Sequence, residues 1–187
     1  MGPMLRCCAV LGAMLFAACA ELPQQGIDET TAAFELTGRI AVRYQDRAFS
    51  SALRWKRDAG GDELWFTAPL GQTIAHLQAD SSGATLTAAD QKQYRAGSIE
   101  SLTRSALGWR LPVAGMRSWV LGLPASSVSA ATIERDNGSR ITRFRQDDMQ
   151  VAFSYANPGA TRPSRIDVAG SEGEIRFVID SLTTPQP

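Results

Sequence analysis

The amino-acid sequence predicts a mainly β protein, in which a largely antiparallel sheet of about eleven strands curls into an apolar trough beneath two short helices. Residues 34–95 contain segments that alternate apolar and polar side chains, as half-buried strands do. Residues 98–124 change to a helical spacing, and residues 132–179 return to strand-like alternation. Because so wide a sheet twists strongly, helices docked on it would cover the trough.

The first part of the chain is expected to form five or six strands, over residues 34–44, 49–56, 63–67, 73–79, 84–87 and 93–95. In the first three, apolar side chains fall on one face and charged ones on the other, so the apolar face should point inward. A register slip of one residue would invert every face. The strand residues that we expect to line a hydrophobic cavity are Leu36, Ile40, Val42, Leu53, Trp55, Leu64 and Phe66.

A tight turn is predicted at Pro69-Leu70-Gly71, between the third and fourth strands. Pro69 fixes its own φ and has no N–H to donate, and Gly71 tolerates a positive φ. Leu70 therefore lies at a hairpin tip, where two interpretations are open. Its side chain folds back onto the rim of the sheet, or it is held out to contact an apolar partner.

Two short helices are predicted in the middle of the chain. Ser98 is suited to cap the first and Gly108 to end it. Pro112 begins the second, which Gly122 and Pro124 close. Helices this short need to dock on the sheet. From the second helical segment we assign Met116 and Val120 to the cavity.

The last third of the chain is expected to form five strands, over residues 132–135, 141–145, 149–155, 165–168 and 174–179. Asn137-Gly138, between the first two, is the strongest two-residue signal for a hairpin.

The N-terminus has the features of a lipoprotein signal peptide over residues 1–18. Arg6 supplies the positive charge, and the apolar run that follows is shorter than the roughly 20 residues of a membrane span. Cys19 follows small residues as a lipidated cysteine does, although Phe16 departs from the usual aliphatic residue. The alternative is ordinary cleavage after an A-x-A-like site. Only Cys19 would survive cleavage, and a lone thiol is a liability in an oxidising compartment, so lipidation is favoured.

Residues 19–32 are expected to form a polar tether, and residues 33–182 a single domain. Ala20 is not Asp, the usual signal for inner-membrane retention, which favours the outer membrane. The formal net charge is zero, without a basic block, so nucleic acid is not an expected partner. We expect a monomer.

The sequence favours binding over catalysis. It contains no P-loop, CxxC pair or G-x-S-x-G elbow. His76 is the single histidine and is expected to be structural or on the surface. Asp147-Asp148 is expected in a hairpin turn, and Asp62-Glu63 at the start of a strand. We therefore expect no metal site and no cofactor.

Several stretches together resemble the outer-membrane lipoprotein receptor LolB family. They are Leu-Thr-Gly-Arg (36–39), Phe-Ser-Ser-Ala-Leu-Arg-Trp (49–55), Pro-Leu-Gly-Gln-Thr (69–73), Leu-Gly-Trp (107–109) with Leu111-Pro112, and Trp-Val-Leu-Gly-Leu-Pro (119–124). The last of these and Pro-Leu-Gly are the specific ones.

The resemblance implies a half-open β-barrel with helices as a lid over a hydrophobic cavity. It also implies a protein that accepts acylated lipoproteins from a LolA-type periplasmic carrier and places them in the outer membrane, facing the periplasm. By the same resemblance, Leu70 corresponds to a protruding loop leucine that contacts membrane lipid. Two other kinds of lipoprotein remain as alternatives: one that shuttles phospholipid or glycolipid, and one that scaffolds an envelope complex. An enzyme is the least favoured interpretation.

Overall fold

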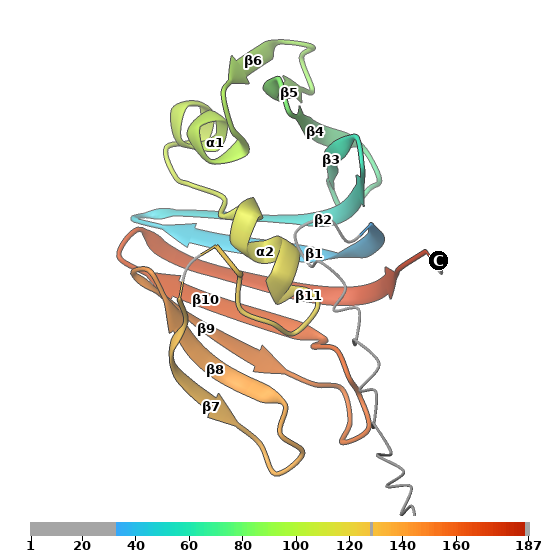
Figure 1. Ribbon diagram of the computed structural model, residues 1–187. Coiled ribbons are helices and arrows are strands. Elements are labelled where there is room, and N and C mark those ends of the chain that lie inside the picture. Colours follow the sequence, from blue (N-terminus) through green and yellow to red (C-terminus); the bar gives the residue numbers. More distant parts are fainter. Residues whose placement is uncertain (1–32, 128, 186–187) are drawn as a thin grey trace, which may run out of the picture.

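The computed structural model describes residues 33–127 and 129–185 (Figure 1). The predicted signal peptide, Cys19 and the tether lie outside the described residues. Most of the described chain belongs to one eleven-stranded sheet with the strand order β6-β5-β4-β3-β2-β1-β11-β10-β9-β8-β7. The strands are β1 (Phe34–Tyr44), β2 (Arg47–Asp58), β3 (Gly61–Thr67), β4 (Thr73–Asp80), β5 (Gly83–Ala88), β6 (Gln93–Ala96), β7 (Ala131–Arg135), β8 (Ile141–Gln146), β9 (Met149–Ser154), β10 (Arg165–Gly170) and β11 (Gly173–Thr183).

The sheet is antiparallel throughout, and its centre is the pairing of the first strand with the last. β1 pairs with β2 on one side and with β11 on the other, so the six N-terminal strands lead to one edge and the five C-terminal strands to the other. Figure 1 shows the sheet curling around the two helices. β6 and β7 are its edge strands, so the barrel that the described residues form is half open, which confirms the predicted fold class.

A bulge in β11 at Asp180, opposite the Thr37–Gly38 step of β1, helps to shape this central pairing. The register between β1 and β11 shifts between Thr37 and Gly38. A Cβ at Gly38 would lie 2.1 Å from the carbonyl oxygen of Val178, so a residue with a side chain would force the two strands apart.

The helices begin and end at the residues that the sequence indicated, with one difference. In α1 (Ile99–Leu107), the Ser98 side chain accepts a hydrogen bond from the backbone N–H of Ser101, and Gly108 closes the helix at a φ of 86°. α2 (Val113–Trp119) begins after Pro112 but ends at Trp119, before the predicted Gly122. α1 lies beside β5 and β6, whereas α2 lies over the middle of the sheet (Figure 1).

Aromatic side chains fill the space between α2 and strands β8 and β9. Phe144 packs edge-to-face on Trp119 and on Phe153, with ring centroids 6.5 and 5.5 Å apart. The buried Gln146 side chain accepts hydrogen bonds from the Trp119 indole N–H at 3.2 Å and from the backbone N–H of Ala125 at 3.0 Å. These bonds satisfy buried polar groups and hold the end of α2 against β8.

A buried ionic cluster fixes α2 to the opposite side of the trough. The Asp62 side chain is fully buried and accepts hydrogen bonds from Trp55 Nε1 at 3.0 Å, Arg57 Nη1 at 2.9 Å and Arg117 of α2. We expected Asp62 to be an ordinary residue at a strand start, but β3 turns it inward beside two guanidinium groups. Losing one partner of such a cluster leaves a buried charge unpaired, so Asp62 is a structural residue.

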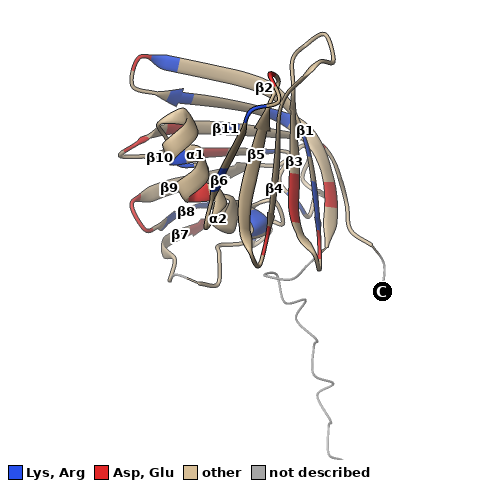
Figure 2. Cartoon of the chain, turned by 90° about the horizontal axis from the view of Figure 1, so that it is seen from above, with Lys and Arg blue, Asp and Glu red and all other residues tan. Residues whose placement is uncertain are grey.

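The outer face of the sheet carries charges of both signs (Figure 2). Cross-strand ion pairs such as Arg54–Glu35 and Arg39–Asp180 lie there, exposed to solvent. His76 is also on this face, stacked on Trp65 with ring centroids 5.0 Å apart and bonded through Nε2 to Glu63. The prediction that His76 is a structural or surface residue is confirmed.

Candidate binding site: an apolar cavity and its rim

An apolar cavity of about 420 Å³ lies between α1 and strands β1–β6. It is lined by Val42, Tyr44, Arg47, Ala48, Phe49, Phe66, Ile74, Ala75, Leu77, Leu86, Ala88, Tyr94, Thr103, Ala106, Leu107, Trp109 and Leu111. Nearly all of these side chains are aliphatic or aromatic. Such a lining suits an apolar ligand.

The cavity runs from a buried floor to an exposed rim. Val42, Leu77 and Leu111 are buried at its floor, and Thr103 is satisfied there by donating to the Ile99 carbonyl and accepting from the Leu111 N–H. The rim includes two large apolar side chains that remain exposed, Tyr94 at 44% and Leu107 at 41%, together with exposed Arg47. An elongated ligand could therefore enter past the rim.

All nine side chains assigned to the cavity from sequence are buried in the core, as their inward direction requires. Val42 and Phe66 border the cavity. The other seven belong to the packed core and do not line it; they are Leu36, Ile40, Leu53, Trp55, Leu64, Met116 and Val120. Alternation along a strand shows which face of the sheet a residue is on, but not whether the space in front of that residue is open or filled. Near α2 the trough is filled by packed side chains.

Most of the lining was missed, and the larger part of what was missed comes from β4, β5, β6 and α1, from which no cavity residue was assigned. Ala75, Ala88 and Ala106 are the informative ones. They are small residues that face inward on β4, β5 and α1, where a packed core would use larger side chains. An excess of alanine on an inward face was the available signal.

The turn that carries Leu70 lies at the same end of the molecule as the cavity, because Phe66 before it and Ile74 after it both line that cavity. The turn is closed by two backbone hydrogen bonds of 2.8 Å, from Ala68 N–H to the Gln72 carbonyl and from Gly71 N–H to the Ala68 carbonyl. Leu70 is 89% exposed, so its side chain does not fold back onto the sheet. A backbone-locked turn thus presents one large apolar side chain to solvent beside the cavity.

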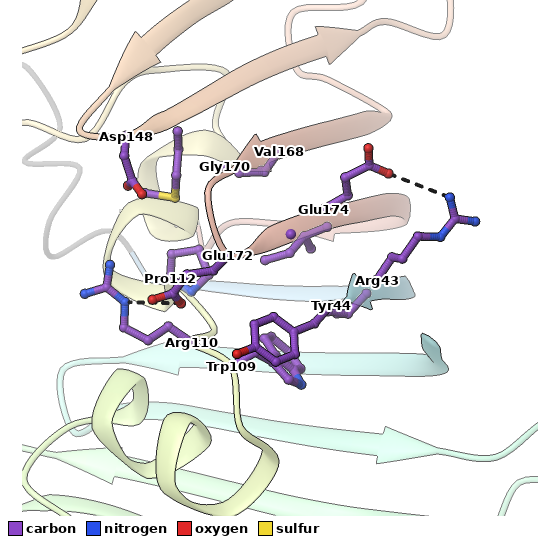
Figure 3. Close-up of a pocket in the computed structure, with 14 residues that line it drawn as sticks. Arg43, Tyr44, Trp109, Arg110, Pro112, Asp148, Val168, Gly170, Glu172 and Glu174 are labelled. Atoms are coloured by element: carbon purple, nitrogen blue, oxygen red, sulfur yellow. Dashed lines mark ion pairs between the residues drawn. The ribbon is translucent and has the colours of Figure 1, made fainter. Parts of the chain in front are cut away.

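Next to the cavity, a smaller and more polar pocket of about 50 Å³ lies between Tyr44 and Trp109 and the β10–β11 turn (Figure 3). Val42, Tyr44 and Trp109 line both spaces. Glu172 in that turn pairs with Arg104 of α1 and lies 3.9 Å from Arg110, so ion pairs join α1 and the segment after it to the far half of the sheet. Nearby, the Ser171 hydroxyl donates to Asp148 at 2.6 Å and lowers the pKa of that carboxyl.

Among the described residues, no cluster of histidine, cysteine and carboxylate side chains has the arrangement of a metal site. No helix within residues 33–127 and 129–185 is long and apolar enough to span a membrane.

A curled antiparallel sheet with a short helical lid over an apolar cavity defines a class of proteins built to bind apolar ligands. The family described as "Outer membrane lipoprotein LolB" matches residues 32–181, and this chain belongs to that family. The resemblance inferred from the sequence is thereby confirmed.

Relatives over most of the chain carry the name outer-membrane lipoprotein LolB. One from Cupriavidus pinatubonensis is 36% identical over 94% of this chain and 93% of its own, and one from Thiobacillus denitrificans is 37% identical over 85% of each. Among solved structures, a LolA-superfamily protein from Nitrosomonas europaea has a TM-score of 0.50 at 10% identity and covers 86% of this chain and 90% of that one. That likeness shows the fold alone.

Proposed function

We propose that this chain is an outer-membrane receptor that accepts acylated lipoproteins from a LolA-type periplasmic carrier into its cavity and inserts them into the outer membrane. The observation that carries the proposal is the pairing of an open apolar cavity with Leu70, which is 89% exposed, at one end of the molecule. Membership of an outer-membrane lipoprotein family supports it.

The physical requirement is a gradient of affinity. Each methylene of an acyl chain gains about 0.8 kcal/mol on leaving water, so a lipoprotein needs continuous cover between membranes. The cavity has to hold the chains better than the carrier does and less well than a bilayer does. Such a gradient moves cargo in one direction without a chemical step, so the proposed function needs neither a catalytic residue nor a cofactor.

Leu70 has a distinct role in this proposal, at the release step. A leucine that enters the acyl boundary of the bilayer gains on the order of 1–2 kcal/mol. Because Phe66 and Ile74 line the cavity on either side of the Pro69–Gly71 turn, insertion of Leu70 brings the cavity rim to the lipid surface. The cargo chains then have a short path into the membrane.

Anchoring through Cys19 completes the proposal and keeps the receptor, as a monomer, on the periplasmic face of the outer membrane. The motivation is the lone cysteine of the mature chain, after a run of small residues. Cys19→Ala is expected to lose acyl modification and to leave the membrane fraction. An unmodified Cys19 mass in the membrane-bound wild type would contradict this part.

The function is tested by incubating the full chain with a carrier loaded with lipoprotein and following where the lipoprotein goes. Wild type is expected to take the cargo. Ala88→Trp, which fills the cavity, should fail, whereas Ala52→Trp on the outer face should behave as wild type. If lipoprotein stays on the carrier while free phospholipid or glycolipid is taken up, the protein is a lipid shuttle and the proposal is wrong.

A further inference from the structure

Arg47 occupies an unusual place in the cavity. Of the residues that line it, Arg47 alone is charged. It belongs to the same face of β2 as Phe49, which also lines the cavity, and it is exposed at the rim. Its strand partner Tyr44 contributes a phenol to the same rim. A guanidinium group and a hydroxyl therefore stand where an apolar interior meets water.

Arg47 differs from the neighbouring arginines near the cavity, which form ion pairs with carboxylates. Arg43, which precedes the strand partner Tyr44 on β1, lies 3.9 Å from Glu174, and Arg104 pairs with Glu172. No ion pair or side-chain hydrogen bond joins Arg47 to another described residue. Its five N–H donors are free to bind a ligand oxygen.

The cavity volume limits what lies below Arg47. An apolar cavity of about 150 Å³ takes up benzene, which corresponds to about 25 Å³ per carbon. At that packing, the cavity of about 420 Å³ holds about 17 carbons. This is the volume of one long acyl chain, and the two or three chains of a lipidated cysteine exceed it.

We propose that the cavity accepts a single acyl chain of about 16 carbons, whose carbonyl oxygen stops at the rim and binds Arg47, assisted by Tyr44. The inference rests on the proposed function and adds to it the capacity of the site and the residue that recognises the polar end of the chain. The apolar lining holds the chain without regard to sequence, and Arg47 selects a chain that ends in an oxygen acceptor. A hydrogen bond to a charged donor at such a boundary is stronger than a neutral one.

The test uses the full chain and two series of probes of roughly 10 to 22 carbons, which displace an uncharged apolar fluorophore. Methyl alkanoates end in a carbonyl oxygen that can accept from Arg47, and the matching alkanes have no acceptor. In the wild type, affinity should rise about fourfold per added methylene and then level off near 16 carbons. Arg47→Leu should weaken methyl alkanoate binding roughly tenfold and change alkane binding less than twofold. Arg43→Leu, an arginine on the outer face, is the matched control and should change neither series.

The outcomes separate the inference from the function on which it rests. Affinity that keeps rising beyond about 20 carbons, or an equal effect of Arg47→Leu on both series, would overturn the inference while leaving the receptor function intact. If no probe of either series displaces the fluorophore, the cavity does not bind chains, and both fail. The same Arg47→Leu variant should also accept lipoprotein from the carrier more slowly than Arg43→Leu does.

Discussion

Two regions of the molecule are built from strands with the same alternating pattern, but one encloses an open cavity and the other a filled core. In the cavity region, formed by the rim ends of β1–β6 with α1, inward alanines leave a space of about 420 Å³. In the packed region, formed by β8–β11 with α2, Phe144, Phe153 and Trp119 interlock edge-to-face, and no residue of that region lines the large cavity. The difference lies in side-chain volume and in where each helix docks, not in the strand pattern.

The comparison shows how one domain can be stable and still keep an apolar space. An empty apolar cavity costs stability, because the side chains around it lose packing contacts. The packed region and the buried Asp62 cluster that holds α2 provide packing and polar contacts that offset this loss of stability. The cavity region can then be specialised for binding.

The largest expected effect on stability comes from truncating an aromatic residue in the packed region. Phe144→Ala should lower the free energy of unfolding by about 3–5 kcal/mol, because Phe144 is fully buried and its neighbours are held by α2. Phe66→Ala, the same truncation at the cavity wall, should cost about 1 kcal/mol less, because part of that ring already faces a space. Denaturant unfolding of both variants measures the difference, and equal losses would contradict the contrast.

Replacing an inward-facing side chain by a larger one should also affect the stability of the two regions differently. Val151→Phe, in the packed region, should cost about 1–3 kcal/mol through overpacking. Ala75→Phe, at the cavity, should change stability by less than about 1 kcal/mol, since the ring has space, but should block the uptake of acyl chains. Thermal melting and dye displacement on both variants provide the measurements. A strongly destabilised Ala75→Phe would mean that the space is not available to a side chain.

Much of this arrangement could be predicted from the sequence, because strand faces and helix ends are local properties. Ser98 and Gly108 mark the limits of α1, and Asn137-Gly138 marks the β7–β8 turn. The pairing of β1 with β11 joins residues more than a hundred positions apart, and no local pattern specifies it. The depth of each inward residue depends on that pairing and on helix docking, which is why Leu36 and Trp55 were assigned to a cavity that they do not reach.

Leu70 should have a small effect on stability and a large effect on delivery. It makes few packing contacts, so Leu70→Glu should change the free energy of unfolding by no more than about 0.5 kcal/mol. Uptake from the carrier should persist, whereas release into liposomes should fail because a carboxylate resists the acyl boundary. Leu70→Phe, which keeps apolar bulk, is the matched control. Release by Leu70→Glu at the wild-type rate would remove Leu70 from the delivery step.

The smallest effect concerns acid sensitivity at the two edges of the sheet. A side-chain hydrogen bond from Arg140 lowers the pKa of Asp136 below its usual 3.8, and Lys92 does the same for Asp90. A carboxyl group whose pKa is lower in the folded than in the unfolded protein stabilises the fold at pH values above its unfolded-state pKa. This contribution is lost as the pH falls through the folded-state pKa.

The Asp136 pair, beside the packed region, is less exposed than the Asp90 pair, beside the cavity region. Asp136→Asn should therefore lower the melting temperature at neutral pH more than Asp90→Asn does, and both differences should vanish in strong acid. Melting curves across this pH range give the comparison. Differences that do not depend on pH would contradict the ionic origin of the effect.

The most direct test of the central claim is to find where the acyl chain of a cargo lies. A lipoprotein with a photoreactive group at the end of an acyl chain would be passed from the carrier to the full chain, crosslinked, and mapped by peptide mass. We predict adducts on residues of the cavity region, such as Phe66, Leu77 and Leu86. Adducts on Phe144, Phe153 or Ile166 of the packed region, or adducts spread evenly over both regions, would contradict the assignment of this cavity as the receptor site.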